Sequence, residues 1–564
     1  MNSDQGGRKE GASRFLSSST KIQHSQHPPL YKLNLQEEKM GEHSPFQKFS
    51  FGKGNQSKEN KVIMLMGATG SGKTMMINAM ANYILGVAWG DDFRFKLITE
   101  ETFRSQAESQ TSIITAYHLA HQDGFQVPYS LTIIDTPGFG DTRGIERDQA
   151  LTEHIREFFS SPRGIDHLDA VCFVVQASLP RLTHTQRYVF DSILSIFGKN
   201  IANNVRVLVT FADGQKPPVL EAIKTSQVPC PKNGAGEPIH FKFNNSALFC
   251  SRAPKATREA GEGEEEEEEE VFDEMFWRMG TGSLKKFFME LGKLQPQSLS
   301  LTQEVLKERK QLEAMVEGLQ VQIQNRLMKM EEIRKITDVL EQNKDKMKAN
   351  ENFEYETSIM EPQQEPIKGF ITNCQKCRYT CHHPCAIPDD REKYNCAAMD
   401  QAGNCKVCPE KCHWKVHFNQ KYRWNYVPKT VKGTYQNLKE NYEKAYGELK
   451  SAEQLSQKLK EDLEGVEDEA QSLIEALSHC IRRLEDIALR PNPLSTPEYI
   501  DILIISEKEE AKPGFQERIE SLNKLKKRAQ LLSDVSQMPE DAQGMPTKGR
   551  KTKWDKMINW FTQS

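Results

Sequence analysis

The chain has little that would place it in a membrane, outside the cell or on nucleic acid. It lacks an apolar run near the roughly 20 residues needed to cross a bilayer, and its N-terminus lacks the apolar core of a signal peptide. It also lacks an excess of basic residues, because its formal charge of -4 disfavours nucleic-acid binding by bulk electrostatics. We therefore expect a cytoplasmic protein with no nucleic-acid partner.

Cysteine is scarce outside one segment of the chain. Of the twelve cysteines, eight fall between Cys374 and Cys412, and in a reducing compartment such clustering favours metal binding over disulfides. Hydrophobic residues make up only 37% of the chain and charged residues 27%, so we expect part of it to remain outside a packed core. At about 150 residues per domain, the 564 residues suffice for three or four units.

A glycine-rich segment between an apolar run and a helical pattern is the most informative stretch. Its residues, which follow Val62–Met66, are Gly67, Ala68, Thr69, Gly70, Ser71, Gly72, Lys73 and Thr74. A turn of this kind binds polyphosphate, because backbone N–H groups can approach the oxygens where no Cβ intervenes. Lys73 is predicted to neutralise the outer phosphates, and the Thr74 hydroxyl to ligate Mg2+. The alternative is an ordinary glycine turn.

A second motif follows the apolar stretch Leu131–Ile134, where Asp135 precedes Thr136, Pro137 and Gly138. An acid at the carboxyl end of a strand beside the glycine-loop strand can hold Mg2+ through water, and the Gly138 N–H can contact a terminal phosphate. The alternating segment Thr111–Tyr117 predicts a strand whose upstream end reaches the nucleotide.

Further apolar stretches predict strands over 169–175, 205–209 and 239–243, with a helix over 183–197. This alternation indicates an α/β fold with a mostly parallel sheet and helices on both faces. The strand over 205–209 runs into Thr210 and Asp213, and we expect the Asp213 carboxylate to accept the N1–H and amino group of guanine. The alternative is an Asp that caps a turn. Ser246 and Ala247, after the strand over 239–243, are predicted to contact the nucleotide.

In this order, the segments Gly67–Thr74, Thr111, Asp135–Gly138 and Thr210–Asp213 resemble the GTPases related to septins and to the immunity-associated GIMAP proteins. The resemblance covers about residues 60 to 250. It implies a Ras-like P-loop G domain in which Thr111 belongs to the first switch and residues 135–144 to the second. Thr111 would then ligate Mg2+ with Thr74 and Asp135, and would act with Lys73 and Gly138 on the terminal phosphate.

Two departures from the resemblance bear on hydrolysis. The usual Asn-Lys-x-Asp base motif is replaced by Thr210-Phe-Ala-Asp213, so the stacking lysine is missing. Phe139 stands where many G proteins keep a water-orienting glutamine. We expect slow GTP hydrolysis, or hydrolysis completed by a second copy in a homodimer or oligomer. The alternative is a nucleotide-stabilised scaffold without significant turnover.

The cysteine cluster contains an internal repeat, Asn-Cys-x2-Cys-x3-Cys-His, at 373–382 and 404–413. Thiolates two residues apart can turn about one metal, and tetrahedral zinc takes four Cys or His ligands. We predict two zinc ions, while iron–sulfur ligation remains an alternative. The predicted ligands are Cys374, Cys377, Cys381, His382, Cys385, Cys396, Cys405, Cys408, Cys412, His413 and His417. Aromatic and basic residues over 414–426 favour packing of this small core over base stacking.

Heptad-like spacing of apolar residues on either side of the cluster predicts a coiled-coil arm. We expect an antiparallel helical hairpin with the zinc module at its tip; parallel pairing with a second copy is the alternative. The predicted units are a disordered tail over 1–58, a G domain over 59–292 with an exposed acidic loop over 251–270, coiled-coil helices over 300–350 and 430–490, a zinc module over 370–428 and a helical unit over 491–535. A basic amphipathic tail over 545–564 suits either an anionic membrane surface or docking on this same protein.

Overall fold

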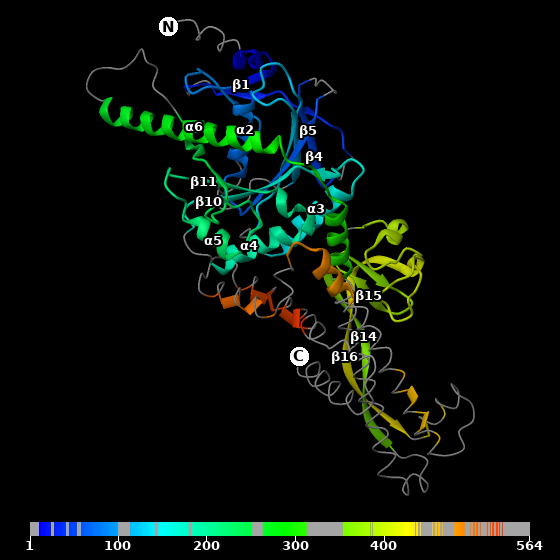
Figure 1. Ribbon diagram of the computed structural model, residues 1–564. Helices are drawn as coiled ribbons and strands as arrows, with labels where there is room; N and C mark the ends of the chain where they lie inside the picture. The colour runs from blue at the N-terminus through cyan, green and yellow to red at the C-terminus, as the bar shows by residue number, and fades with distance from the viewer. Residues whose placement is uncertain are drawn as a thin grey trace. The chain divides into compact units, whose positions relative to one another are not determined.

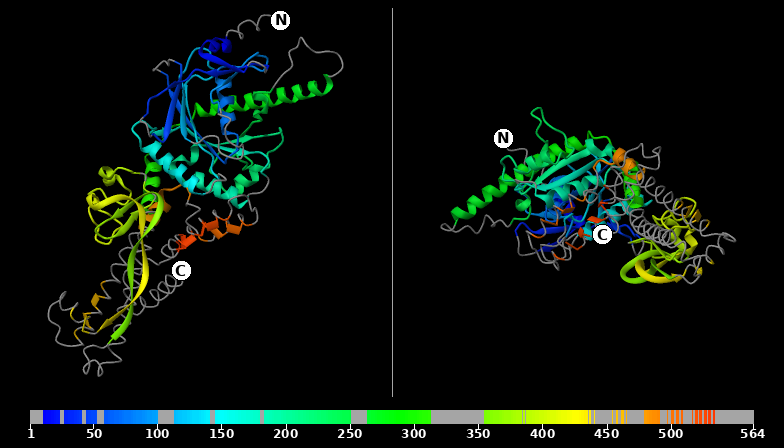
Figure 2. Two further views of the ribbon diagram at one scale, coloured as in Figure 1. Left: turned by 180° about the vertical axis from the view of Figure 1, so that it is seen from behind. Right: turned by 90° about the horizontal axis from the view of Figure 1, so that it is seen from below.

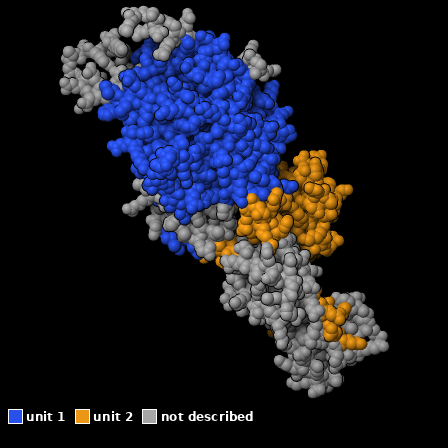
Figure 3. Space-filling model, viewed as in Figure 1, with its two compact units in different colours: residues 1–307, 487–494, 498–524 blue, residues 308–486, 495–497, 525–564 orange. Residues whose placement is uncertain are grey.

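The computed structural model describes residues 11–312 and 354–434 with short gaps, residues 479–490, and isolated positions between 436 and 533. The gaps are 24–26, 41–43, 53–57, 100–112, 141–144, 180–182, 251–262, and positions 384 and 386. The chain divides into two compact units (Figure 3). Unit 1 comprises residues 1–307, 487–494 and 498–524, and unit 2 comprises the remainder.

Unit 1 is built on an eight-stranded sheet in the order β12-β11-β10-β5-β8-β7-β4-β3 (Figure 1). Its strands are β3 (Gln36–Glu37), β4 (Phe46–Phe51), β5 (Asn60–Gly67), β7 (Ile114–Leu119), β8 (Ser130–Asp135), β10 (Ala170–Gln176), β11 (Val205–Thr210) and β12 (His240–Lys242). Neighbouring strands from β12 to β8 are parallel, and β7 is antiparallel to β8. The buried, apolar β5 and β10 are typical of strands covered on both faces.

Helices cover both faces of this sheet, which confirms the predicted α/β fold (Figure 2). On one face, α2 (Lys73–Ile84) and α6 (Gly263–Leu291) share a hydrophobic core with β5 and β8. On the other, α3 (Ile145–Ser160) and α4 (His184–Ser195) pack against the strands: the rings of Phe158 and Phe46 lie 4.9 Å apart, as do those of Phe190 and Phe173. Thr183 caps α4 as its side chain accepts the Gln186 N–H.

The prediction that residues 1–58 are disordered is wrong for much of this segment. It contributes β4, which pairs in parallel with β7, and Phe15 is buried with its ring 6.3 Å from that of Phe51. The segment has few apolar residues, but the sheet supplies partners for its backbone, so a few buried side chains suffice to hold it.

The remaining elements of unit 1 are short. They are η1 (Arg14–Ser18), β1 (Ser19–Gln23), β2 (Leu30–Leu33), β6 (Arg94–Lys96), β9 (His167–Leu168), η2 (Lys199–Asn204), α5 (Val219–Thr225), η3 (Asn245–Leu248) and β13 (Gln297–Ser298). β1, β2 and β6 form a separate three-stranded sheet, and β13 pairs with β9. Residues 300–312 are helical.

The prediction of an exposed acidic loop over 251–270 is also wrong in part, because α6 begins at Gly263 and includes the acidic run Glu264–Glu270. Glutamate is a good helix former, and negative charge in the first turns is favoured by the helix dipole. Residues 251–262 lie outside the described part of the chain. Further along α6, Trp277, Leu284 and Phe287 are buried in the core.

Unit 2 contains a long two-stranded ribbon in which β14 (Glu354–Cys374) pairs antiparallel with β16 (His417–Thr434) (Figure 1). The cysteine-rich segment connects the two strands at one end and contains β15 (Tyr379–His382), η4 (Asp390–Asn395) and η5 (Trp414–Val416). The prediction that a second coiled-coil helix begins at residue 430 is therefore wrong, because β16 extends to Thr434. The β-branched Thr430, Val431 and Thr434 favour a strand at this point.

Most of the predicted coiled coil, over 313–353 and much of 435–478, lies outside the described residues, as do most of the unit over 491–535 and all of the tail over 545–564. Residues 479–487 are helical, and Arg490 then donates to the carbonyls of Ser226 and Gln227 within unit 1. No helix among the described residues is both long and apolar enough to cross a membrane.

A buried ion pair supports β5, the strand that carries the glycine loop. Lys61 Nζ lies 3.1 Å from Asp169 Oδ1, and the Val62 N–H donates to Asp169 Oδ2 at 2.7 Å. We expect Asp169→Ala to lower the free energy of unfolding by about 3 kcal/mol, because the buried Lys61 ammonium loses the buried carboxylate beside it and the Val62 N–H loses its acceptor. Glu59, whose side chain also pairs with Lys61 but is 64% exposed, provides the matched control: Glu59→Ala is expected to cost less than about 1 kcal/mol. Chemical denaturation measures both, and equal losses would contradict this account.

Candidate functional site

The glycine loop joins the end of β5 to the start of α2, as the sequence predicted. Gly70 and Gly72 adopt φ values of 75° and 86°, which side chains other than glycine rarely allow. A Cβ at Gly67 would lie 2.3 Å from the carbonyl oxygen of Val174. The three glycines are therefore required by the backbone path, which leads directly into the N-terminus of a helix, where anions bind well.

Lys73 lies folded over this loop. Its Nζ donates to the carbonyl oxygens of Gly67 at 3.2 Å and Ala68 at 3.0 Å, and the side chain is buried. Burial lowers the pKa of Lys73 to about 8, against the opposing effect of the Asp135 carboxylate. Thr74 follows in the first turn of α2 and is half-buried.

Asp135 ends β8 opposite Leu65 of β5, and is 1% exposed. Nearby in the loop, Thr69 Oγ1 and Ser71 Oγ are buried without a hydrogen-bond partner among the described residues. Buried hydroxyls normally have partners, and phosphate oxygens with a hydrated cation would supply them. The site therefore fits Mg2+ with a polyphosphate, with Thr74 and Asp135 as the cation's protein contacts.

The backbone after Asp135 pairs with the glycine loop. The Thr69 N–H donates to the Phe139 carbonyl at 2.9 Å, and the Phe139 N–H donates to the Gly67 carbonyl at 3.2 Å. A Cβ at Gly138 would lie 2.5 Å from the Thr69 backbone, so only glycine fits. The structure thus places Gly138 beside the loop. The Phe139 side chain is fully buried. Thr111 lies outside the described residues.

The segment after β11 also reaches the glycine loop. Thr210 Oγ1 donates to the Ser71 carbonyl at 2.8 Å, so its role is to position the loop. Asp213 is exposed, and its Oδ1 accepts the Gln215 N–H at 3.0 Å, as in the turn-capping alternative. This bond leaves Oδ2 available to a base. Ser246 donates to Asn244 Oδ1 at 2.9 Å, and Ala247 is buried.

Two residues that sequence reasoning did not select also contact this site. Phe211 is 55% exposed with φ 54°, and its ring would lie 3.6 Å from a Cβ on Gly72. The sequence did offer a signal for Phe211, because this residue stands where the usual base motif has its lysine. Gln176, the last residue of β10, donates to the Gly70 carbonyl at 2.9 Å. Nothing in the sequence distinguishes it from other polar residues at strand ends.

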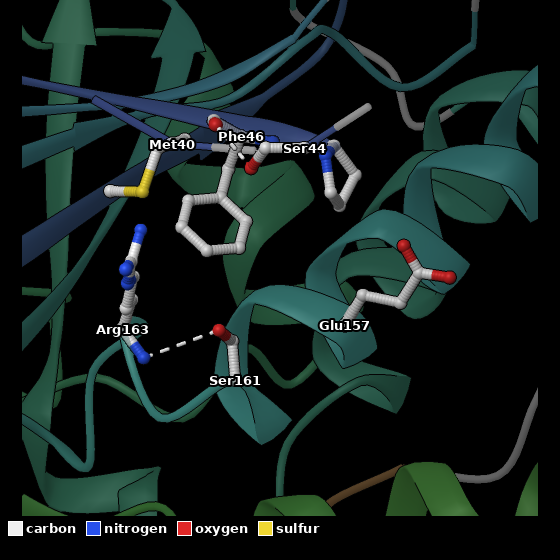
Figure 4. A pocket seen from close by; sticks show the side chains of 7 residues that line it. Met40, Ser44, Phe46, Glu157, Ser161 and Arg163 are labelled. Carbon is white, nitrogen blue, oxygen red and sulfur yellow. Dashed lines mark hydrogen bonds between the residues drawn. The ribbon is translucent and has the colours of Figure 1, made fainter. Parts of the chain in front are cut away.

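A shallow hollow of about 250 Å³ lies elsewhere on unit 1 (Figure 4). It is lined by Met40, Ser44, Pro45, Phe46, Glu157, Ser161 and Arg163. None of these residues belongs to the glycine loop or the base-reading segment, so the hollow is separate from the predicted nucleotide site.

The cysteine-rich segment of unit 2 brings ten of the eleven predicted ligands into three groups, each with its ligand atoms within 4.8 Å of one another. The groups are Cys374, Cys377, Cys408 and Cys412; Cys381, Cys405, Cys408 and His417; and His382, Cys385 and Cys396. Most of these side chains are buried. Thiol and imidazole groups gathered in this way suit a soft divalent metal such as zinc.

His413 does not join these groups, so its prediction as a ligand is wrong. Its ring is exposed, and Nδ1 accepts the Lys415 N–H at 3.4 Å, which caps η5. The aromatic residues that follow behave as the packing interpretation predicts: Tyr426 donates to the Arg378 carbonyl at 3.0 Å, and its ring packs against the cysteine core. The basic Arg423 pairs with Glu365 across the ribbon.

Comparison with known proteins gives one family match and a set of similar solved structures. Residues 61–223 match the model of the AIG1 family, and no curated protein matches the chain. Among solved structures, Toc33 from Arabidopsis thaliana in complex with Mg2+ and GMPPNP is 16% identical with a TM-score of 0.26, over 41% of this chain and 87% of Toc33. The signal recognition particle receptor SRb-GTP/SRX complex from Chaetomium thermophilum is 20% identical with a TM-score of 0.21, over 35% and 94%. LeoA, a bacterial dynamin GTPase from ETEC, is 14% identical with a TM-score of 0.22, over 51% and 47%.

The family match covers β5 from its second residue, the glycine loop, β8, β10, β11 and Asp213, whereas η3 with Ser246 and Ala247 lies beyond it. Residues 61–223 therefore form a GTP-binding, AIG1-type P-loop GTPase domain.

Proposed function

We propose that unit 1 acts as a switch of the septin and GIMAP kind, in which GTP binding and hydrolysis change the self-association of the chain. The observation that carries this proposal is the pairing of the 138–139 backbone with the glycine loop at Thr69. Because this segment lies directly on the phosphate-binding loop, occupancy of the loop and the position of the segment depend on one another.

The residues of the site have distinct roles in this proposal. The loop amides and Lys73 bind the phosphates, and Thr74 and Asp135 hold Mg2+. When bound, Mg2+ neutralises charge on the β- and γ-phosphate oxygens. Thr111 and Gly138 contact the terminal phosphate, so its loss on hydrolysis releases both segments. To reach the phosphates, Lys73 exchanges its two loop carbonyls for phosphate oxygens.

Hydrolysis requires a group to orient the attacking water, and Phe139 does not supply one because its side chain is fully buried. We infer that a second copy of the chain completes the site in a homodimer or oligomer. The same burial supports the competing function, a scaffold that binds nucleotide for stability and recruits partners through its arm.

Base recognition is assigned to Asp213 and its neighbours. The carboxylate oxygen not used by Gln215 accepts from guanine, and the exposed ring of Phe211 offers an apolar surface where other GTPases place a lysine stem. Ser246 and Ala247 lie in η3, which packs against α2. These contacts select guanine over adenine, which lacks the N1–H and the 2-amino group.

We further propose that the cysteine-rich segment of unit 2 binds zinc in the cytoplasm, where thiols remain reduced. The segment between β14 and β16 is too short to bury a substantial apolar core, and cysteines are seven of the eleven buried residues in the hydrophobic cluster that it forms with the end of β14. Metal ligation would then supply the free energy that holds it folded.

Asp213→Asn tests base recognition separately from the turn. An asparagine side chain retains the oxygen that caps Gln215, so stability is expected to be unchanged. Its amide NH2 group, however, would face the N1–H and 2-amino donors of guanine, whereas it can donate to the C2 carbonyl of xanthine. We expect GTP binding to weaken at least about tenfold and XTP binding to strengthen, since a charged hydrogen bond contributes about 1.5–3 kcal/mol. Equal affinities for GTP in the two proteins would assign Asp213 to the turn alone.

The concentration dependence of turnover distinguishes the switch from the scaffold. We expect the rate of GTP hydrolysis per chain to rise with protein concentration, because a second copy completes the site. Lys73→Ala, the control, is expected to bind no nucleotide. A wild-type chain that retains guanine nucleotide yet shows no turnover at any concentration would support the scaffold instead.

Replacement of Phe139 by glutamine tests whether this position can orient water. Since the side chain is buried, Phe139→Gln places an amide in the core without partners, and we expect the free energy of unfolding to fall by about 2 kcal/mol or more. GTP hydrolysis is expected not to rise. Phe139→Leu, which keeps the site apolar, should lose less stability. Faster hydrolysis in the glutamine variant at unchanged stability would show that the side chain reaches the nucleotide.

A further inference from the structure

We propose that the cysteine-rich segment holds two metal ions bridged by the Cys408 sulfur, with a third ion bound separately by His382, Cys385 and Cys396. This arrangement rests on the zinc binding proposed above, and it specifies how many ions are bound and how they are linked. The metal class is zinc, because sulfur and imidazole in closed tetrahedral sets are its usual ligands.

The number of ligands requires a shared residue. The first two groups each contain four ligands and have only Cys408 in common, so seven side chains fill eight coordination positions. A tetrahedral structural zinc site takes four protein ligands. If Cys408 served one ion alone, the other would keep three. A bridging thiolate completes both sites.

Distances between sulfur atoms match a common metal rather than a disulfide. Cys377 Sγ and Cys412 Sγ lie 3.6 Å apart, and Cys385 Sγ and Cys396 Sγ lie 3.9 Å apart. The edge of a tetrahedron about a metal with bonds of about 2.3 Å is about 3.8 Å. A disulfide needs about 2.05 Å. The pairs are therefore spaced as ligands of one ion.

His417 provides an independent indication of a metal. It is 1% exposed, and its Nδ1 lies 3.1 Å from the His413 carbonyl oxygen. Donation to this carbonyl fixes the proton on Nδ1 and leaves the lone pair on Nε2. Nε2 is buried and has no hydrogen-bond partner among the described residues, although it belongs to the second group. A histidine that ligates a metal through one ring nitrogen usually donates the N–H of the other to a carbonyl or carboxylate oxygen.

Backbone amides point at the sulfur atoms of both groups. The Cys377 N–H donates to Cys374 Sγ at 3.4 Å, the Cys408 N–H to Cys405 Sγ at 3.3 Å, and the Cys412 N–H to Cys408 Sγ at 3.3 Å. Such donors stabilise thiolates, which are the form that binds metal. Cys408 Sγ, the sulfur shared by the two groups, accepts one of these hydrogen bonds.

The third group shares no residue with the other two. His382 Nδ1 lies 3.2 Å from Cys396 Sγ, and Lys393 Nζ lies 3.5 Å from Cys385 Sγ. Lys393 is fully buried and otherwise donates to the Ile387 carbonyl. A buried ammonium needs a negative partner, and the Cys385 thiolate is the one beside it. With three ligands among the described residues, this ion has one position open to a further ligand.

In this arrangement, each of the two bridged ions takes ligands from both copies of the sequence repeat. The first copy contributes Cys374 and Cys377 to one ion and Cys381 to the other, while the second contributes Cys412 to the first ion and Cys405 to the second. Cys408 of the second copy serves both. Neither copy therefore forms a site alone, which accounts for the close association of the two.

The wild-type, full-length protein provides the first test, by zinc analysis and zinc X-ray absorption after purification in zinc. We expect about three zinc ions per chain and a zinc–zinc distance shorter than about 4.6 Å, since each ion lies about 2.3 Å from the shared sulfur. Zinc without a zinc–zinc distance in this range would overturn the bridge alone. A chain that binds no zinc would overturn the proposed zinc function itself.

Variants test the sharing directly under a competing chelator. Cys408→Ser is expected to release two ions, because both tetrahedral sites lose a ligand, whereas the matched controls Cys377→Ser and Cys396→Ser each release one. Release of a single ion by Cys408→Ser would overturn the bridge. GTP binding by unit 1 shows whether each variant chain is otherwise intact, and if Cys408→Ser fails to fold, the wild-type absorption data decide the question.

Discussion

Main-chain pairing between residues 138–139 and the glycine loop is the constraint on which the nucleotide site depends. It brings the end of β8 to the phosphate position and fixes Gly138 against Thr69, where no Cβ fits. The same pairing turns the Phe139 side chain into the interior. A residue that is held in the core cannot also orient water, so the contact that couples the loop to its neighbour also removes the usual catalytic group at this position. The proposal that a second copy completes the site rests on this geometry as well as on the missing glutamine.

The elements of the site that could be predicted from sequence were those fixed by local patterns. Glycines with φ near 75° and 86° are required by a tight turn, and apolar runs mark β5 and β8 as buried strands, so their position and chemistry follow from residue type. Strand β4, which lies between β7 and the edge strand β3, was missed because its stability depends on pairing with β7. β7 lies far along the chain, so this pairing leaves no local pattern in a polar segment. Phe211 and Gln176 were missed for a related reason, since their contacts with the loop arise only when parallel strands bring their ends together.

Cysteine spacing in unit 2 indicated metal but not the grouping of ligands. A Cys-x2-Cys pair shows that two thiolates can meet at one ion. The rest of each four-residue group, however, includes cysteines from the other copy of the repeat, and His417 lies outside both copies. The ribbon itself pairs residues about 80 positions apart at its far end, which no short-range pattern reveals. His413 illustrates the limit: its sequence context matches that of the buried His382, yet it caps a 3-10 helix at the surface.

Both sites contain buried polar atoms that lack partners within the described protein, the Thr69 and Ser71 hydroxyls in unit 1 and His417 Nε2 in unit 2. Such atoms lower stability until a ligand satisfies them. Binding therefore contributes directly to folding, and a ligand present at about 100 times its dissociation constant adds about 2.7 kcal/mol. For domains whose total stability is about 5–15 kcal/mol, this is a substantial share. In the proposed functions the two units differ in one respect. Exchange and hydrolysis of nucleotide would change the stability of unit 1 through the cycle, whereas permanently bound metal ions would keep that of unit 2 constant.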